Sequence, residues 1–443
     1  MKNSLGKDFT IWTLLKFTFA PTVMMIFMAL YTMIDGVFVS NLINDYALSA
    51  VNIVYPAVSV VVAVAIMLGT GGSAIIAKNM GEGKEQEARE NFSLICTFGL
   101  ILGIIIAIVG VIFIDNIILL LGATDKLFDY CHDYAVIIIM FTPMAIFQML
   151  FQNFFVTAGK PQLGLIVTLL GGVANIVLDY VFVAIFQMGI GGAAVATGIG
   201  YSIPAIYGIY YFGIKKKTLL HFVKPVLRSH VLLKTCTNGS SEMITNLSIS
   251  VTTFLFNIMM LKYLGENGVA AITIILYAQF LLTSIFIGYS QGVGPIFSYN
   301  YGEKNYRKIK KYFKMSMLII FVSSILMMVV SMQFEDVLIG IFARPNTEVF
   351  NIAKEGFMLF AISFAFTGFN IFASALFTAF SNGKISAFIS MLRTFVFLVL
   401  SILLLPQIIG YNGIWLSVPL AELLGLGISI ICLIRSKNEY MYF

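Results

Sequence analysis

The sequence is poor in charge and in the residues of common catalytic sites. Charged side chains make up 11% of the 443 residues, and only 3 histidines and 4 cysteines occur, whereas soluble domains are about 25% charged. The cysteines are scattered without a C-x-x-C spacing, and no HExxH motif is present. We therefore expect the cysteines to act as small buried hydrophobic residues, and we expect no cofactor and no enzymatic activity.

Long hydrophobic runs take the place of charge. Hydrophobic residues form 59% of the chain, and the mean hydropathy is +0.95. Because a helix needs about 20 apolar residues to cross a bilayer, the runs predict an all-α membrane protein with twelve transmembrane helices. The predicted spans cover residues 11–40, 51–77, 92–121, 134–158, 162–186, 192–213, 231–262, 269–298, 312–334, 353–380, 386–406 and 413–434. The first span carries Lys16 and Asp35 and is too long for a secretory signal.

The basic residues are distributed unevenly over the predicted loops. With a cytoplasmic N-terminus, the outer side holds only a few of the 27 Lys and Arg residues, namely Lys126, Lys262, Arg344 and Lys354. Lys16 and Arg393 fall inside spans, and the others lie on the cytoplasmic side. This bias predicts that both termini are cytoplasmic. The loop charges "IKKK" and "RKIKK" thus indicate topology, and we expect no nucleic-acid binding.

The second half of the chain repeats the first. The stretch 69–89, "GTGGSAIIAKNMGEGKEQEAR", reappears at 290–310 as "SQGVGPIFSYNYGEKNYRKIK", and Gly81 recurs as Gly302, 221 residues later. Each half holds six spans, so both halves enter the membrane from the same side and form a parallel repeat. We predict two pseudo-symmetric six-helix lobes around a central cleft, with a cytoplasmic linker between them: residues 1–213, 231–443 and the linker 214–230. This is the architecture of an alternating-access carrier.

Carboxylates inside the apolar spans are the main functional signal. Asp35, Asp179, Glu242 and Glu422 all fall within predicted spans. A central Asp costs about 2.5–3.5 kcal/mol on insertion scales, so such a group normally faces the protein interior or water. Accepting hydrogen bonds from a neighbouring helix is the structural alternative. Because two aspartates close together in low dielectric do not both ionise readily, Asp35 and Asp179 would hold a proton or share a cation.

Asp179 has polar neighbours in the sequence. Asn175 lies four residues earlier on the same helical face, Thr197 follows on the next span, and the glycines at 171–172 allow close helix approach. Together with Asp35 these residues supply hard oxygen ligands, which suit Na⁺ or, between carboxylates, H⁺. The predicted cation-coupling site, a metal site only if the ion is Na⁺, is therefore Asp35, Asn175, Asp179 and Thr197.

Aromatic, thioether and amide side chains near the carboxylates are candidates for a substrate site. The helical face around Asp35 carries Met28, Tyr31 and Phe38. These side chains suit an organic cation through cation–π contacts and adaptable packing, although ordinary helix packing explains the same stripe. Gln148 and Gln152 form an i, i+4 amide pair, which either lines a cavity or joins helices.

The seventh span, "TCTNGSSEMITNLSISVTTF", is the most polar in the chain. Asn238, Glu242 and Asn246 follow one another at four-residue steps along one helical face. A face this polar is unsuited to lipid, so we expect it to border the central cleft. Glu242 and Asn246 therefore join the candidate substrate-binding residues, and Glu422 near Pro419 is a weaker candidate.

Together these features resemble the multidrug and toxic compound extrusion (MATE) transporters, in their MepA-like branch of bacterial drug exporters. The resemblance covers essentially all 443 residues. It rests on the proline early in the first span, "YTMIDGVFVSNL", "GTGGSAIIAKNMGEGK", "NIVLDYVF" followed by "GGAAVAT", and the repeated glycine–Asn–x–Gly loop. It implies twelve helices in two lobes around a V-shaped cleft. It also implies an antiporter that expels amphipathic, mostly cationic drugs or toxins in exchange for Na⁺ or H⁺.

The resemblance also implies where ions bind. The family's N-terminal cation site falls on the four residues chosen above: Asp35, Asn175, Asp179 and Thr197. Some relatives have a second site in the C-terminal lobe, built from a Glu on the seventh span and an Asp on the tenth. Glu242 matches the Glu, but "GFMLFAISFAFTGFNIFASALF" contains no Asp. We expect a monomer in the bacterial inner (plasma) membrane, with organic cations and membrane lipid as partners.

Two alternatives remain open at this point. A lipid-linked precursor flippase of the same superfamily shares the lobed architecture but needs cationic groups in its cavity, and Arg393 is the one basic residue deep in a span. An intramembrane aspartyl protease needs a water-accessible pair of aspartates, usually in a glycine-flanked motif, whereas Asp179 lies in "VLDYV". Because the embedded charges are mainly acidic, the sequence favours the exporter of cations.

Overall fold

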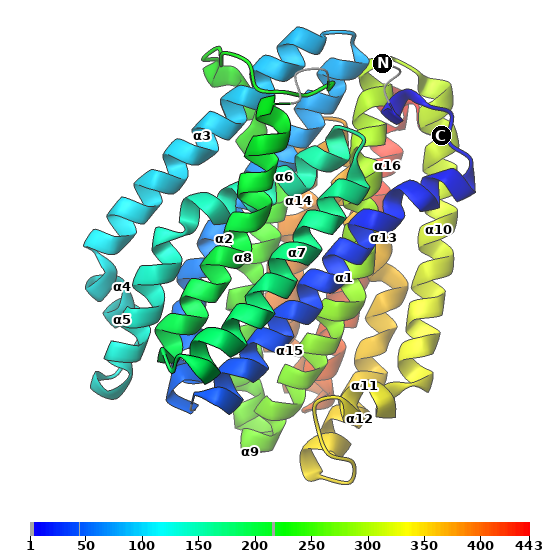
Figure 1. The fold of residues 1–443 in the computed structure, drawn as a ribbon. Helices are drawn as coiled ribbons and strands as arrows, with labels where there is room; N and C mark the ends of the chain where they lie inside the picture. The colour runs from blue at the N-terminus through cyan, green and yellow to red at the C-terminus, as the bar shows by residue number, and fades with distance from the viewer. Residues whose placement is uncertain (1–3, 44, 215–217) are drawn as a thin grey trace.

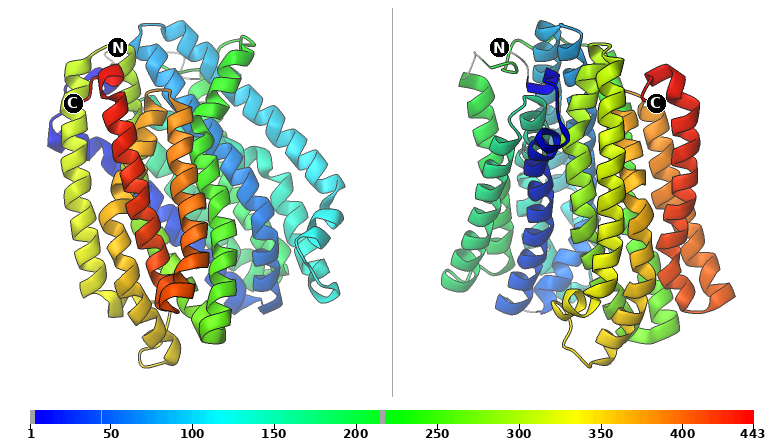
Figure 2. Two further views of the ribbon diagram at one scale, coloured as in Figure 1. Left: turned by 180° about the vertical axis from the view of Figure 1, so that it is seen from behind. Right: turned by 90° about the vertical axis from the view of Figure 1, so that its right-hand side faces the viewer.

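The computed structural model describes residues 4–43, 45–214 and 218–443, except for the side chains of residues 35–42 and Asp45. The regular elements of this described part are all helices, packed into one bundle (Figure 1). The first and last described residues lie at the same end of the bundle, as two further views confirm (Figure 2). We call this end the terminal end.

The number of membrane spans follows from helix length and bending. Among the described residues, 10 helices are long and apolar enough to cross a membrane. α9 (Ser229–Gly302) has 74 residues, which is about 110 Å of helix, and a non-helical Gly265 (φ 64°, ψ −156°) divides it into two spans. α5 (Asp125–Met140) and α6 (Thr142–Thr157) meet at 52° and together make one further span. The chain is therefore an integral membrane protein with the twelve spans that the sequence predicts.

The remaining helices complete two lobes of six spans each. Those of the N-terminal lobe are α1 (Ile11–Leu42), α2 (Asp45–Gly81), α3 (Glu85–Ile112), α4 (Ile114–Leu120), α7 (Pro161–Asp179) with the π-helical segment η2 (Tyr180–Ile185), and α8 (Gly189–Ile214). Those of the C-terminal lobe are α10 (Tyr306–Gln333), α11 (Glu335–Gly340), α12 (Glu348–Phe360), α13 (Phe364–Ala379), α14 (Gly383–Met391) with the π-helical segment η4 (Leu392–Phe397), α15 (Leu398–Ile409) and α16 (Asn412–Tyr440).

Two predicted spans have different bounds in the structure. The third, predicted over 92–121, ends at Ile112, because Phe113 (φ −104°, ψ 18°) leaves the helical conformation and the following apolar residues form the separate helix α4. The fourth, predicted over 134–158, begins earlier, at Asp125. Its first turns are polar and helical, with an acidic residue at the helix N-terminus where the helix dipole favours it.

Large apolar side chains cover the outside of the bundle. Ile108 on α3, Leu326 on α10 and Leu404 on α15 are each more than half exposed or close to it. A water-soluble protein rarely exposes apolar patches of this extent, because burial of apolar area is the main driving force of folding. In a bilayer the same side chains contact lipid, which fits the transmembrane assignment.

Glycines bring the backbones of the two lobes together at the terminal end. Gly81 at the end of α2 lies directly against the backbone of Tyr299 on α9, and Gly302 lies against the backbone of Lys78 on α2. Neither glycine leaves room for a Cβ atom. Because Tyr299 follows Lys78 by the same 221 residues that separate the two glycines, the contact is reciprocal. It marks the axis that relates the two lobes.

The first described residues connect the lobes at the same end. We call residues 4–10 the N-terminal strap. The strap precedes α1 of the N-terminal lobe, but it lies on the C-terminal lobe: the Tyr312 hydroxyl donates to the Lys7 carbonyl (2.9 Å) and Lys311 Nζ lies 2.6 Å from Asp8 Oδ1. The glycine contact and the strap therefore hold the terminal end closed in this structure.

Candidate ion and substrate sites

A buried polar group lies inside the N-terminal lobe. Asn175 and Asp179 on α7 and Thr197 on α8 are 2%, 1% and 7% exposed. Asn175 Nδ2 donates to Thr197 Oγ1 (3.4 Å), and the same hydroxyl donates to the Ala193 carbonyl (3.0 Å). The structure thus brings together three of the four residues that the sequence predicts for the coupling site. We call Asn175, Asp179 and Thr197 the N-lobe polar site.

Glycines let the helices around this site approach one another closely. A Cβ on Gly171 would lie only 2.7 Å from the Gly200 carbonyl oxygen, and a Cβ on Gly172 would enter the Phe27 ring of α1. Small residues at helix crossings permit such approaches within membranes. The predicted role of the two glycines in α7 is therefore confirmed, and it places α1, α7 and α8 around the polar site.

The chemistry of the N-lobe polar site suits a small cation. Within the described part of the chain, Asn175 Oδ1 is buried and accepts no hydrogen bond. The π-helical segment η2 starts directly after Asp179, and π-helical turns occur mostly at functional sites. A buried carboxylate, an available amide oxygen and a hydroxyl are ligands that Na⁺ accepts, and the carboxylate alone accepts H⁺.

Two predicted residues cannot be placed by their side chains. The backbone of Asp35 and Phe38 belongs to α1, but their side chains lie outside the described residues. The pairing of Asp35 with Asp179 therefore stays a prediction. For the same reason the finding that no cluster of three or more His, Cys, Asp or Glu residues is arranged to hold a metal ion applies only to the described side chains.

The other predicted residues of α1 and α6 lie inside the N-terminal lobe. Gln152 Nε2 lies 3.3 Å from both Met28 Sδ on α1 and Thr168 Oγ1 on α7. Gln148 is buried one turn earlier on α6, and the Tyr31 ring lies 6.0 Å from the Phe27 ring on α1. Gln152 thus joins three helices, which is the second of the two roles open for the amide pair.

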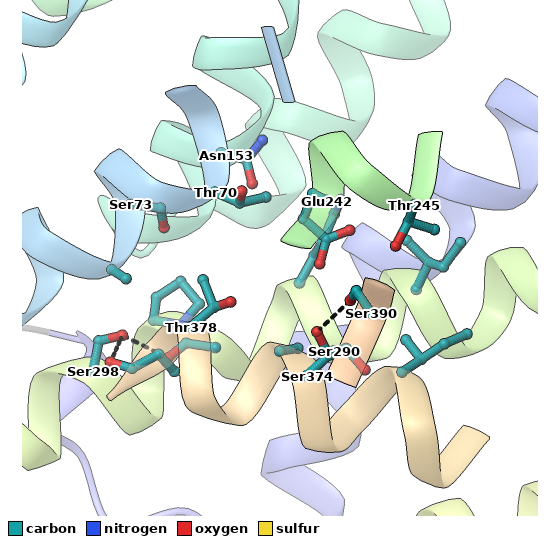
Figure 3. Close-up of a pocket in the computed structure, with 18 of the residues that line it drawn as sticks. Thr70, Ser73, Asn153, Glu242, Thr245, Ser290, Ser298, Ser374, Thr378 and Ser390 are labelled. Atoms are coloured by element: carbon teal, nitrogen blue, oxygen red, sulfur yellow. Dashed lines mark hydrogen bonds between the residues drawn. The ribbon is translucent and has the colours of Figure 1, made fainter. Parts of the chain in front are cut away.

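A second polar region lies between the two lobes (Figure 3). It is a cavity of about 740 Å³, counted up to its open mouth. We call it the central cavity. Its polar and charged lining residues come from α2 and α6 of one lobe and from α9, α13, α14 and η4 of the other: Thr70, Ser73, Asn153, Glu242, Thr245, Ser290, Gln291, Ser298, Ser374, Thr378, Ser390 and Arg393. Hydroxyl groups dominate this lining.

The polar face of the seventh span is divided in the structure. Glu242 lines the central cavity (Figure 3), as expected for a face that borders the cleft. Asn246 instead donates its amide to the Glu242 carbonyl (2.9 Å), and Asn238 is buried and donates to the Thr378 carbonyl on α13 (2.9 Å). Four-residue spacing drifts around a helix with 3.6 residues per turn, so the three side chains do not share one environment.

A G-x-S-x-G sequence at 288–292 also reaches the central cavity. Its serine, Ser290, sits in the middle of α9, with helix on both sides. A hydrolase nucleophile of this motif requires a sharp strand-to-helix turn that exposes the serine. The motif therefore does not form a nucleophile here, and its glycines instead let α9 pack closely against Thr22 and Thr18 of α1.

The sequence did not predict a buried ion pair in the C-terminal lobe. Arg393 Nε lies 3.8 Å from Glu422 Oε1, and the two residues are 8% and 7% exposed. Asn370 Nδ2 donates to Glu422 Oε2 (2.7 Å), and Ser429 Oγ donates to Asn370 Oδ1 (2.9 Å). The one signal in the sequence was an Arg and a Glu in consecutive apolar spans, which alone does not specify that they meet.

Comparisons with known proteins agree with this arrangement. The MatE family model matches residues 21–181 and again 243–403. The multidrug export protein MepA of Staphylococcus haemolyticus is 25% identical over 346 residues, which cover 76% of each chain. Two solved structures cover the whole chain: a MATE protein in complex with MaL6 (TM-score 0.93, 21% identity, all of that chain) and an outward-facing multidrug resistance MATE transporter of the MOP superfamily (TM-score 0.91, 22% identity, 99% of that chain). The two matched segments confirm the internal repeat.

Proposed function

This chain belongs to the MatE family, and from that premise we propose that it is an antiporter that exports amphipathic, mostly cationic drugs or toxic compounds from the cytoplasm. The chain is a transporter and not an enzyme. The relative from Staphylococcus haemolyticus is named a multidrug export protein, and the polar groups of this chain suit the same task. Their position inside the lobes, away from lipid, is what a transport pathway requires.

The observation that carries the proposal is the buried carboxylate of Asp179 beside Asn175 and Thr197. Loading such a group with H⁺ or Na⁺ changes its charge, and moving a charge in low dielectric is associated with large energies. We propose that Asp35 completes this site, on the grounds of its place in α1 and the family resemblance. The ion would then favour one arrangement of α1 against α7 and α8, and its loss would favour another.

The proposed transport cycle alternates access between the two lobes. The positive-inside bias supports a cytoplasmic terminal end, in the plasma membrane of a bacterium. The glycine contact and the N-terminal strap close that end in this structure, so we infer that these contacts open when substrate enters from the cytoplasm. The proposed substrate-binding residues are those of the N-lobe interior and the central cavity: Met28, Tyr31, Phe38, Gln148, Gln152, Glu242 and Asn246.

The lipid flippase is the weaker alternative. A pyrophosphate-linked lipid carries several negative charges, whereas the one arginine of the central cavity is already paired with Glu422. A net neutral pair gives little attraction to a multiply charged headgroup. Stronger transport of anionic lipid than of organic cations would reverse this preference.

Efflux from proteoliposomes tests the proposal. The purified protein is given a cationic dye under an imposed Na⁺ gradient and, separately, under an imposed pH gradient. We expect one of the two gradients to drive efflux of the dye, and the active gradient identifies the coupling ion. We expect Asp35→Asn to abolish efflux while the protein remains in the membrane. Full transport by this variant would contradict the coupling role of Asp35.

A further inference from the structure

The central cavity carries opposite charges on its wall. Among the described residues that line it, Glu242 and Arg393 are the charged ones. Glu242 projects from the first half of α9 toward the serines of α13 and α14 (Figure 3). Arg393 comes from the π-helical segment η4, directly after α14. A purely cationic substrate has a use for the carboxylate but none for the guanidinium.

The guanidinium of Arg393 is buried without satisfactory hydrogen bonding. Its Nε lies 3.8 Å from Glu422 Oε1, which is beyond hydrogen-bond distance, and this nitrogen has no hydrogen-bond partner in the described part of the chain. The other oxygen of Glu422 is occupied by Asn370. A buried donor that lacks an acceptor destabilises the protein until an acceptor arrives. Arg393 therefore gains from a ligand that brings an oxygen acceptor into the cavity.

The position of Arg393 is fixed by its surroundings. Gly425 on α16 leaves space for the stem of the arginine, since a Cβ there would lie 2.8 Å from Arg393 Cγ and 3.1 Å from Asn370 Nδ2. Glu422, one turn earlier on the same helix, holds the guanidinium electrostatically. The side chain is thus kept at the cavity wall and does not extend to the membrane surface, as arginines near helix ends usually do.

We propose that Arg393 is the carboxylate-binding residue of a subsite in the central cavity, and that the protein accepts amphipathic zwitterions as well as cations. The amine of such a molecule binds to Glu242, and its carboxylate forms the two parallel hydrogen bonds that a guanidinium offers. The hydroxyls of Ser374 and Ser390, 3.0 Å apart on the same wall, supply further donors. Glu422 then positions Arg393 without touching the substrate. The inference rests on the proposed export function and names a substrate class for the same cavity.

A matched pair of dyes tests this subsite. Rhodamine B is a zwitterion, and its ethyl ester is a cation of almost the same size that lacks the carboxylate. Binding of both to the purified protein is measured by fluorescence anisotropy, and efflux of both is measured in proteoliposomes. In the double variant Arg393→Gln/Glu422→Gln, which leaves no buried charge unpaired, we expect the affinity for rhodamine B to fall about tenfold or more and that for the ester to change less than about twofold.

Ser429→Ala is the control for a merely structural effect. It removes the support of Asn370 but leaves the guanidinium in place, so both affinities should stay near those of the wild type. Equal loss of both dyes in the double variant, or the same change in Ser429→Ala, overturns the subsite. Transport of the ester without binding of rhodamine B by the wild type overturns the subsite alone. Binding of neither dye overturns the subsite, and absence of all efflux overturns the proposed function.

Discussion

At equivalent positions the two lobes carry different side chains on the same helical scaffold. The two segments that match the family model are 222 residues apart. With this spacing the bond between Gln152 and Thr168 corresponds to the bond between Ser374 and Ser390, which shows that the lobes share their packing. The close backbone contact of Gly171 with Gly200 corresponds to a pair of charged residues, listed here with their separation: Arg393 and Glu422, 3.8 Å.

The carboxylate that we assign to ion coupling has no counterpart in the other lobe. Asp179 corresponds to Ser401 on α15. The C-terminal lobe thus holds one positive and one negative buried charge that compensate each other, whereas Asp179 changes the net charge of its surroundings when it is loaded. The comparison teaches that a duplicated fold keeps its helix crossings while its halves divide the tasks. One half responds to ions, and the other holds fixed charges at the cavity.

Exchanging the coupling carboxylate is expected to give the largest effect. Asp179→Asn keeps the size of the side chain but removes its charge, so ion-driven efflux in proteoliposomes should fall to background while membrane insertion is retained. The matched control is Ser401→Ala at the corresponding position of the C-terminal lobe, which should transport like the wild type. Equal efflux by Asp179→Asn and Ser401→Ala would remove the functional difference between the lobes.

Breaking the ion pair of the C-terminal lobe is expected to reduce stability next most strongly. Glu422→Gln leaves a buried guanidinium uncompensated and should lower the free energy of unfolding by about 3 kcal/mol. Adding Arg393→Gln should restore most of this loss, because no buried charge remains. Thermal unfolding of the purified single and double variants gives the comparison. A single variant as stable as the double variant would show that the pair has no structural role.

The corresponding contact in the N-terminal lobe should be sensitive to size and not to charge. Gly171→Ala places a methyl group against the Gly200 carbonyl and should cost about 1–3 kcal/mol of unfolding free energy, because the helices α7 and α8 must separate. Gly427→Ala on α16 is the control, since its Cβ would meet no atom within 4 Å and Ala favours helix by up to about 1 kcal/mol. Unchanged stability of Gly171→Ala would refute the tight crossing.

The N-terminal strap should give the smallest effect. Lys311 beside Asp8 holds the pKa of this exposed carboxyl below its usual 3.8. A lowered carboxyl pKa means that the contact is present above this range and is lost as the pH falls through the lowered value. Asp8→Asn should mimic this loss at neutral pH and speed amide exchange of residues 4–10 without changing global unfolding. Lys310→Gln, which changes a charge on the same helix, should leave the exchange rate of the strap unaltered.

The sequence predicted the fold well because membrane spans depend on local composition. Apolar run length determined the twelve spans, and the repeat of the stretch around Gly81 in the second half predicted paired lobes. The bounds of the third and fourth spans were wrong, since Phe113 ends α3 inside an apolar run and the polar residues after Asp125 are helical. Hydropathy responds to composition and does not detect where backbone dihedral angles change.

The candidate sites were predictable only where spacing along one helix suffices. The four-residue step from Asn175 to Asp179 predicted a shared face, and the structure places both inside the N-terminal lobe. The ion pair of Arg393 with Glu422 joins two different helices, and its formation depends on the crossing of η4 with α16. A sequence taken alone contains no direct measure of that crossing, so the most charged part of the cavity was not predicted.

The meeting of Gly81 and Gly302 bears on how often the transporter can repeat its cycle. Because main chain touches main chain there, the surfaces can part and rejoin without any side chain changing its rotamer. The spacing at closure is set by backbone dimensions, which are the same in every cycle. Each return to the closed form therefore ends in the same register, with nothing between the lobes that is able to lodge in the wrong orientation.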